Sequence, residues 1–279
     1  MTRWWWVLAL LAIGVARCEC VDDGAREPIR FATFNIEDFP KDERQVDGAF
    51  AEIRALGASF VAVQEIGDPG LFAREATARL GPRWQLVSID ARPIGETRPG
   101  YHIGVLFDGA RWAYAGMRTH DGTRVNLRLM PTLEVRLRQG DRFVRVLVVH
   151  FKSGTEGRSS RVLQFAALRE IVREVQKSRE PVVVLGDFNA TEEGDRDDLA
   201  ALAKVAKLSW ATEPLACSAF WRRQDGCPRS RLDHVLMWAP PIDVHAAGAC
   251  ATDGCEWQAS CPLYARAISD HCPVVVDVE

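Results

Sequence analysis

The stretch VVVLGDFNA, residues 182–190, combines an apolar run with a polar end. Four aliphatic residues in succession predict a buried β-strand. Gly186 permits a close approach of another backbone, and Asp187 and Asn189 then present oxygen-bearing side chains in one place. An apolar strand followed by Gly-Asp-x-Asn therefore predicts a sheet whose rim carries a functional site.

Apolar runs on both sides of this stretch predict further strands, at 29–34, 60–63, 84–89, 102–107, 132–137, 143–149, 232–237 and 274–278. Apolar residues at helical spacing predict helices over 43–56, 69–80 and 160–177. Gln139-Gly140-Asp141 indicates a hairpin, and 190–216 and 246–267 are expected to be loops with short helices. The mixture predicts β-sheets with helices on their outer faces, in a single domain over residues 29–279 that follows an N-terminal segment, 17–28.

Polar side chains stand at the ends of the other apolar strands as well. They are Asn35 with Glu37, Glu65, His150 with Lys152, Asp233 before His234, and Asp270 with His271. Each has an ordinary explanation by itself, such as a turn asparagine, a solvated acid or a structural histidine. A strand delivers its terminal side chains to one rim of a sheet, so that six such ends predict one shared site.

These residue types suit the chemistry of phosphate esters. Glu65 and Asp270 offer the oxygen ligands that Mg²⁺ and Ca²⁺ prefer. His150 can protonate or orient a phosphate, and Lys152 can neutralise it. Asp233 can hold the imidazole of a histidine in the required tautomer.

In this order the motifs resemble the endonuclease/exonuclease/phosphatase superfamily, the group that contains deoxyribonuclease I. They are TFNIE (33–37), QE (64–65), His150, GDFNA (186–190), LDH (232–234) and SDHCP (269–273), and the resemblance spans residues 29–278. The closing segment AISDH (267–271) is similar to deoxyribonuclease I in particular. The segment NLRLMP (126–131) looks like the one in which that enzyme keeps a phosphate-contacting arginine, which here is Arg128.

The resemblance implies an α/β (α+β) fold, a four-layered sandwich of two mixed β-sheets flanked by helices. It implies a phosphodiester hydrolase that depends on Mg²⁺, Mn²⁺ or Ca²⁺, and it leaves open whether one or two ions act. It assigns catalytic roles to His150, Asp187, Asn189, Asp233 and His271. It assigns metal binding to Asn35, Glu65 and Asp270, and phosphate binding to Arg128 and Lys152.

Residues 1–16 have the features of a secretory signal peptide, with Arg3 near the start and an apolar run that ends at the small residue Ala16. The run is shorter than the roughly 20 residues of a membrane-spanning helix, which argues against an anchor. A lipoprotein anchor on Cys18 is the third reading, but Arg17 stands where a small residue is expected. We therefore expect a secreted or periplasmic protein without a stable membrane span.

Eight cysteines follow this segment, namely Cys18, Cys20, Cys217, Cys227, Cys250, Cys255, Cys261 and Cys272. Their even number fits disulfides in an oxidising compartment. The near pairs Cys217–Cys227 and Cys250–Cys255 are the expected local bridges, although spacing leaves the connectivity open. The chain has no CxxC pair and no suitably spaced histidine beside the cysteines, which argues against a zinc site.

The charge balance bears on the substrate. Removal of residues 1–16 takes away Arg3 and moves the formal net charge from −3 to −4. An acidic protein lacks the overall basic field typical of nucleic-acid binding, but net charge does not report a local cationic cleft. A composition with 47% hydrophobic and 26% charged residues excludes a disordered chain.

The leading hypothesis is a secreted nuclease that cleaves DNA, with RNA as a further substrate. The sequence leaves open whether it cleaves within a strand or from its end. The alternative is a phosphatase or a phospholipid or sphingomyelin phosphodiesterase on the same site, for which the sequence shows no apolar membrane-contacting insertion. A non-catalytic binding module or toxin subunit should lack one of the polar positions, and all are filled. We expect a monomer without a protein partner, with nucleic acid as its substrate.

Overall fold

The computed structural model describes residues 28–98 and 100–279. The predicted signal peptide, 1–16, lies outside the described residues, as do Cys18 and most of the N-terminal segment, 17–28. Within the described ranges, no helix is both long and apolar enough to cross a membrane.

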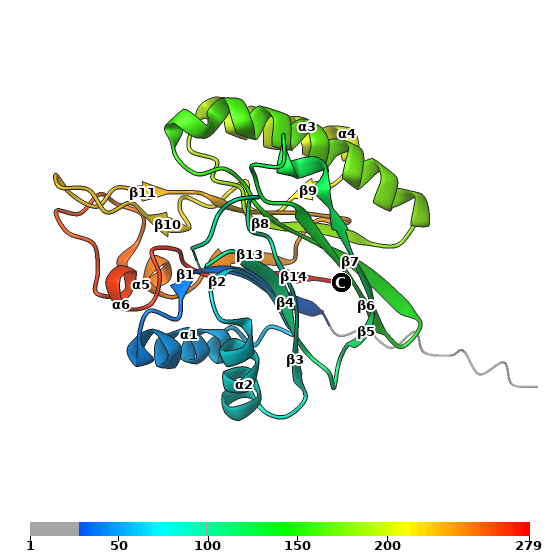
Figure 1. Cartoon of the computed structure of the whole chain (residues 1–279), viewed down its shortest axis with the longest axis horizontal. Helices are drawn as coiled ribbons and strands as arrows, with labels where there is room; N and C mark the ends of the chain where they lie inside the picture. Colours follow the sequence, from blue (N-terminus) through cyan, green and yellow to red (C-terminus); the bar gives the residue numbers. More distant parts are fainter. Residues whose placement is uncertain (1–27, 99) are drawn as a thin grey trace, which may run out of the picture.

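Sheet A has six strands in the order β13-β14-β1-β2-β4-β3 (Figure 1). Their bounds are β1 (Ile29–Phe39), β2 (Phe60–Ile66), β3 (Trp84–Asp90), β4 (His102–Asp108), β13 (Asp243–Ala246) and β14 (Val274–Val278). The pair β1 and β2 is parallel and the other pairs are antiparallel. Helices α1 (Glu43–Leu56) and α2 (Pro69–Leu80) bury Phe50, Ile53 and Phe72 against the outer face of this sheet.

Sheet B has six strands in the order β5-β6-β7-β8-β12-β9. Their bounds are β5 (Ala113–His120), β6 (Thr132–Gln139), β7 (Arg142–His150), β8 (Val182–Asp187), β9 (Ser209–Trp210) and β12 (Asp233–Met237). Here β7 and β8 form the parallel pair. Helices α3 (Arg158–Val175) and α4 (Glu193–Ala206) cover its outer face, and the short helices η1 (Asp121–Arg124), η2 (Thr155–Gly157) and η3 (Gln176–Ser178) lie in the connections.

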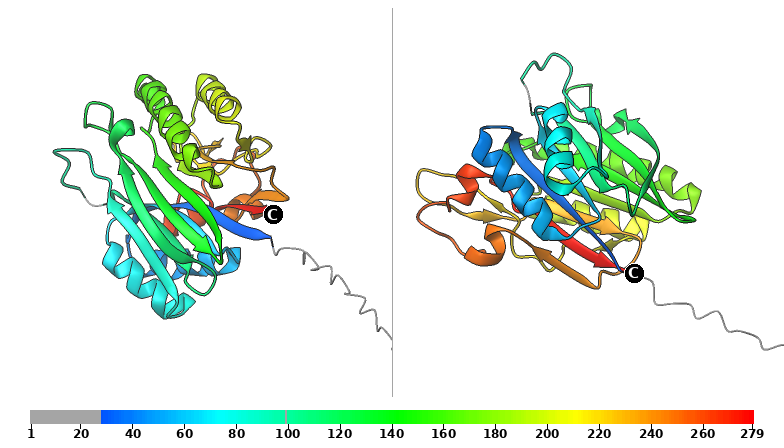
Figure 2. Two further views of the ribbon diagram at one scale, coloured as in Figure 1. Left: turned by 90° about the vertical axis from the view of Figure 1, so that its right-hand side faces the viewer. Right: turned by 90° about the horizontal axis from the view of Figure 1, so that it is seen from below.

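The two sheets pack face to face, and their inner faces form the main core. Phe31 and Phe60 of sheet A stack at 5.0 Å between ring centroids, and they share this core with Val183 and Leu185 of sheet B. Figure 1 shows the resulting four layers, with α3 and α4 above and α1 and α2 below, and Figure 2 shows them from two further sides. The structure thus confirms the predicted four-layered sandwich of two mixed sheets, whose central strands are apolar on both faces because both are covered.

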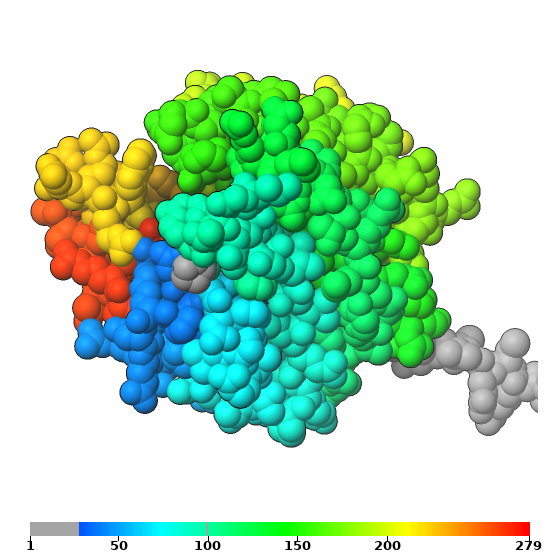
Figure 3. Space-filling view, viewed as in Figure 1, coloured from blue at the N-terminus to red at the C-terminus, as the bar shows by residue number. Residues whose placement is uncertain are grey.

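A disulfide-linked lobe, residues 217–230 and 249–272, projects at one end of the sandwich (gold to red in Figure 3). It contains the paired strands β10 (Ala219–Phe220) and β11 (Arg229–Ser230) and the short helices α5 (Ala249–Asp253) and α6 (Tyr264–Ala267). The expectation of loops with short helices over 246–267 is therefore confirmed.

The expected local cysteine bridges are wrong. The structure pairs Cys217 with Cys255, Cys227 with Cys261 and Cys250 with Cys272. Each bridge joins segments at least 22 residues apart, because the lobe folds its two halves against each other. Closing longer loops removes more conformational entropy from the unfolded chain, so these bridges are also the more stabilising ones.

Helix α4 and strands β5 and β13 were not predicted, nor were the two-residue strands β9, β10 and β11. Residues 190–216 contain the long helix α4, whose Leu199, Leu202 and Ala206 are buried at helical spacing. That pattern was readable in the sequence. The edge strands β5 and β13 carry mostly exposed side chains, and an edge strand needs no apolar alternation to pair on one side.

An ion-pair network joins β5, β6 and β7 in sheet B. Buried Glu134 accepts a hydrogen bond from His120 Nε2 at 2.7 Å and one from Arg145, which also bonds Glu180. Burial by itself raises the pKa of Glu134, but the bonds from His120 and Arg145 outweigh it and hold that pKa below its usual 4.5. A carboxyl whose pKa is lower in the folded than in the unfolded state stabilises the protein above the unfolded value, and this stabilisation is lost as pH falls through the folded value.

We therefore expect Glu134→Gln to lower the melting temperature at neutral pH and to lose this difference from the wild type as the pH falls below the usual carboxyl pKa of 4.5. Thermal melts across this range measure it. Glu170→Gln removes a carboxylate from an exposed pair with Arg173 and should change the melting temperature little at any pH. A difference that stays constant with pH contradicts a contribution from the charge of Glu134.

Candidate active site

The topology explains why the polar strand ends meet. Asn35 and Glu65 lie at the carboxyl ends of the parallel strands β1 and β2, and His150 and Asp187 end the parallel strands β7 and β8. The antiparallel strand β12 starts beside Asp187, which faces Asp233 in register. In sheet A, β14 likewise starts next to the end of β1. Six strand ends therefore share one rim of the sandwich.

Gly186 is required where β8 approaches β7. Its φ is +138°, and a Cβ at this position would collide with the carbonyl oxygen of Val149. Only glycine adopts this conformation without strain. The close approach sets His150 directly opposite Asp187 in the parallel register.

A cavity of about 1170 Å³ opens at this rim. Its walls come from both sheets and from the disulfide-linked lobe. The predicted site residues that line it are Glu65, Arg128, His150, Lys152, Asp187, Asn189, Asp270 and His271. Asn35 and Asp233 are fully buried behind this lining, and each is hydrogen-bonded to a lining residue. The structure thus brings together the residues to which the sequence assigned a role, whereas His234 of the LDH motif does not line the cavity and bonds Thr212 and Trp210 instead.

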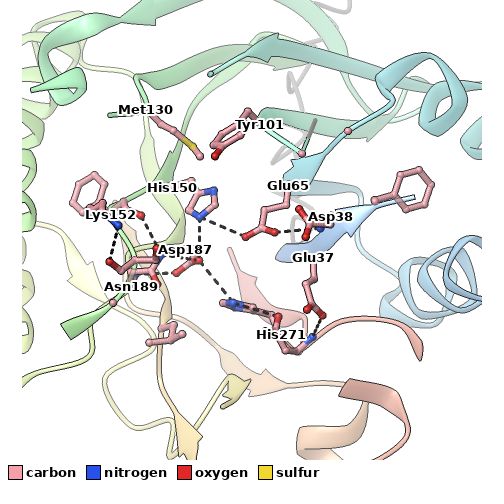
Figure 4. Close-up of a pocket in the computed structure, with 18 of the residues that line it drawn as sticks. Glu37, Asp38, Glu65, Tyr101, Met130, His150, Lys152, Asp187, Asn189 and His271 are labelled. Atoms are coloured by element: carbon pink, nitrogen blue, oxygen red, sulfur yellow. Dashed lines mark hydrogen bonds and ion pairs between the residues drawn. The ribbon is translucent and has the colours of Figure 1, made fainter. Parts of the chain in front are cut away.

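Asp187 lies at the centre of the site (Figure 4). Its Oδ2 accepts hydrogen bonds from Asn189 at 3.0 Å and from Asn35 at 3.2 Å. The same oxygen lies 3.5 Å from Nε2 of His150 and 3.8 Å from Nε2 of His271. Burial raises the pKa of Asp187, against the opposing effect of the two histidines. One carboxylate therefore stands between two imidazoles in a water-poor setting.

The two histidines differ in how they are held. Nδ1 of His271 lies 2.8 Å from Oδ2 of buried Asp233, and this oxygen also accepts a bond from Ser218 at 2.7 Å. Burial lowers the pKa of His271, but Asp233 and Asp187 raise it well above its usual value, which favours the imidazolium. Nδ1 of His150 is buried without a hydrogen-bond partner among the described residues. Asp233 therefore orients His271 and not His150.

Carboxylates converge on the side of the cavity near β1 and β2. Glu65 accepts a bond from Asn35 at 2.9 Å and lies 3.7 Å from His150. Burial raises the pKa of Asp270 to about 6, and the neighbouring Glu37 and Glu65 contribute to the rise. A divalent cation bound between such neighbouring carboxylates would relieve their mutual repulsion.

The donors present fit a hard metal ion. Glu65, His150 and Asp187 each offer a ligand atom within 4.8 Å of the others, and so do Asp187, Asp233 and His271. Oxygen donors predominate in both sets, as Mg²⁺ and Mn²⁺ require. The amide NH₂ of Asn35 donates to the carboxylates of Glu65 and Asp187, and its oxygen accepts from the backbone N–H of Glu37. Asn35 therefore holds the two carboxylates at a fixed distance from each other.

Glu37 belongs to the motif TFNIE, but no role in the site was predicted for it. Glu37 binds Arg222 and Lys41 and accepts a bond from the backbone N–H of Asp270 at 2.9 Å. Its place two residues after Asn35, on the same side of the strand, was the sequence signal that could have assigned it to the site. Arg222, which also lies 3.6 Å from Asp270, comes from the lobe, and only the tertiary structure brings it here.

The cationic residues of the site lie on different segments. Arg128 and Lys152 both line the cavity, as do Lys41 and Arg98. Arg229 and Arg231, which stand near Arg222 in the sequence, do not reach it. Arg229 lies over the ring of Phe220, and Arg231 donates to the backbone oxygen of Leu215.

This arrangement defines a hydrolase site in which carboxylates, two histidines and cations face one cavity between two sheets. The sequence matches the model of the Endonuclease/Exonuclease/phosphatase family over residues 32–271, and the chain belongs to that family. It is therefore a phosphoesterase of a family that uses divalent metal ions, and its site has side chains suited to hold one.

Solved structures share the fold. TDP2 from Danio rerio complexed with single strand DNA product has a TM-score of 0.66 at 12% identity, and the match covers 90% of this chain and 99% of that one. The catalytic domain of human nocturnin with bound sulfate has a TM-score of 0.67 at 19% identity, covering 91% and 94%. A family protein from Bacteroides vulgatus has a TM-score of 0.62 at 16% identity, covering 91% and 99%. No curated protein matches the sequence.

Proposed function

We propose that the protein is a secreted, divalent-metal-dependent nuclease that hydrolyses phosphodiester bonds of DNA, with RNA as a further substrate. The observation that carries the proposal is the position of Asp187, buried between His150 and His271 in a cavity that carboxylates and cations share. A phosphodiester is anionic and repels hydroxide, so its hydrolysis needs a positioned water, neutralised charge and an acid for the leaving oxygen.

We assign the proton transfers as follows. Asp187, held by Asn189 and Asn35, aligns the attacking water and takes its proton as the new P–O bond forms. His271, kept as imidazolium by Asp233, protonates the leaving oxygen as the old P–O bond breaks. His150 lies on the other side of Asp187 from His271, and from there it contacts the phosphate.

Charge neutralisation falls to the remaining residues. Arg128 and Lys152 line the cavity and offset the added negative charge of the transition state. Glu65 and Asp270, with Asn35 beside them, would hold a Mg²⁺ or Mn²⁺ ion, which when bound supplies neutralisation of the phosphate oxygens.

The cavity walls support a nucleic acid as the substrate. Tyr101 and Trp221 both line the cavity although they are far apart in the sequence. Each stands next to an arginine, since Arg98 donates to the hydroxyl of Tyr101 at 2.9 Å and Arg223 lies 5.8 Å from the ring centre of Trp221. Aromatic rings interleaved with cations are typical of surfaces on which bases stack and phosphates bind. The TDP2 structure, by its title, holds a DNA product.

Secretion is part of the proposal. Three disulfides in the lobe agree with an oxidising compartment, as does the apolar run in residues 1–16. Reducing compartments rarely keep such bridges.

One observation favours a phospholipid phosphodiesterase as the second candidate. Ile94 and Leu127 are 70% and 54% exposed, and the backbone N–H of Ile94 donates to the oxygen of Leu127 at 3.3 Å. Their neighbours Pro93 and Arg128 line the cavity, so two exposed apolar side chains stand beside its mouth. Such side chains beside an arginine can insert into a lipid interface.

The test incubates the purified protein with plasmid DNA and Mg²⁺, with and without EDTA, beside an RNA, a phosphomonoester and a sphingomyelin substrate. We expect cleavage of the plasmid that stops with EDTA and returns when Mg²⁺ or Mn²⁺ is added in excess. Intact DNA together with hydrolysis of another ester overturns the nuclease assignment. Cleavage that persists in EDTA overturns the metal dependence.

A further inference from the structure

Arg161 of helix α3 is fully buried, and it bonds two loops of the site from behind the cavity lining. Nε and Nη2 of its guanidinium donate to the two carboxylate oxygens of Asp195 at 2.9 and 2.7 Å. Nη2 also donates to the hydroxyl of Thr191 at 2.9 Å, and Nη1 donates to the backbone oxygens of Lys152 and Gly154 at 3.0 and 2.6 Å. Each nitrogen of the guanidinium is thus engaged.

The two bonded loops carry site residues. Residues 151–154 follow His150 at the end of β7 and include Lys152. Residues 188–192 follow Asp187 at the end of β8 and include Asn189. Arg161 itself lies outside the cavity lining, so any effect on the reaction passes through these loops.

The backbone of the first loop is held at four consecutive polar atoms. The N–H of Phe151 donates to the oxygen of Asp187 at 2.8 Å, and its oxygen accepts from Asn189 at 3.0 Å. The N–H of Lys152 donates to Gln164 of α3 at 2.9 Å, and its oxygen accepts from Arg161. Lys152 is therefore fixed by α3, whereas Phe151 is fixed by the loop after β8.

We propose that Arg161 is a positioning residue, which holds the loop of Lys152 in register with the loop of Asn189 so that the cation meets the same phosphate as Asp187. This inference rests on the proposed phosphodiesterase function. A planar fork of five N–H donors suits the task because it bonds four acceptor groups in fixed directions at once, which the single ammonium of lysine does not. Gly157 leaves room for this fork, since a Cβ there would lie 2.9 Å from Nη1.

A test must separate positioning from stability. Removing Arg161 alone leaves the carboxylate of Asp195 buried without its main partner, which is strongly destabilising by itself. The double variant Arg161→Met with Asp195→Asn removes both charges and keeps an oxygen that can accept from the N–H of Thr191. Replacing both members of a buried pair by uncharged residues is often close to neutral for stability.

The experiment measures kcat and KM of the double variant on DNA, and its melting temperature, in wild-type and Lys152→Met backgrounds. We expect kcat to fall about 30- to 100-fold with a melting temperature close to that of the wild type, because a displacement near 1 Å can have such an effect. We expect Lys152→Met to lower kcat in the wild type but to add little in the double variant, because its ammonium is already misplaced. A purely structural role does not produce this lack of additivity.

The matched control is Arg145→Met with Glu134→Gln, an ion pair that joins β7 to β6 away from the cavity. It should leave kcat within about twofold of the wild type. A double variant at Arg161 that keeps wild-type kcat, or in which Lys152→Met retains its full effect, overturns the positioning role. Absence of any phosphodiester hydrolysis by the wild type overturns the proposed function and with it this inference.

Discussion

Replacing Asp187 by asparagine is expected to lower kcat for DNA hydrolysis by about a thousandfold or more. Asparagine keeps the shape of the side chain but cannot take a proton from the attacking water. The NH₂ groups of Asn35 and Asn189 both donate to Oδ2 of Asp187. An asparagine NH₂ in the place of this oxygen would face two donors and lose both hydrogen bonds. Neutralising the carboxylate further removes the attraction that holds His150 and His271 toward the centre of the site.

Steady-state kinetics on a defined oligonucleotide measures this loss. The matched control is Asp277→Asn in β14, where the carboxylate pairs with Arg30 at the opposite end of sheet A. That variant should keep wild-type kcat, since the pair is partly exposed and distant from the rim. An Asp187→Asn enzyme that retains more than about a tenth of wild-type kcat contradicts the role of Asp187 as the base.

Asp233→Asn is expected to have the second largest effect, a loss of about a hundredfold or more in kcat. Asp233 is fully buried and bonds Nδ1 of His271, so the carboxylate fixes the tautomer and stabilises the imidazolium. Asparagine can present its NH₂ to Nδ1 instead, which requires Nδ1 to be unprotonated, so that the ring stays neutral and its Nε2–H is far too weak an acid to protonate the leaving oxygen. The leaving oxygen then departs as an alkoxide, unassisted by His271.

The role of His271 as an acid predicts a dependence on the leaving group. A thymidine phosphodiester with a p-nitrophenyl leaving group needs little protonation, so Asp233→Asn should lower its hydrolysis far less than that of DNA. Asp243→Asn is the matched control, because Asp243 bonds Nδ1 of His245 at 2.8 Å on the exposed strand β13. Equal losses on both substrates argue for a general disruption of the site in place of a missing acid.

Much of the fold was predictable from local sequence. The apolar runs gave the positions of nine strands, and three amphipathic patterns gave the positions of α1, α2 and α3. Helix α4 was missed although its buried leucines have helical spacing, because the acidic start of the segment looks like a loop. The edge strands β5 and β13 were missed for a different reason, since their side chains are largely solvent-exposed.

The cysteine pairing shows where sequence spacing fails. Cys250 and Cys255 are close in the chain, but Cys250 is buried beside Cys272 at the start of β14, whereas Cys255 meets Cys217. A disulfide forms between side chains that the folded backbone brings together. The two halves of the lobe, residues 217–230 and 249–272, are far apart in the sequence and contact each other only in the folded protein.

The amino-acid sequence by itself determined which residues stand at strand ends, and hence the chemical inventory of the rim around Asp187 and His271. This is local information, because apolar runs and the residues that end them need no distant partner. Only the tertiary structure decided which imidazole Asp233 orients, that Arg222 reaches Glu37, and that Arg161 holds the loop of Lys152. Asp233 and His271 are 38 residues apart, Glu37 and Arg222 are 185 residues apart, and Arg161 joins the loop of Lys152 to Asp195, which lies 34 residues after Arg161. How close these residues come is set by how the two sheets, the helices and the lobe pack together.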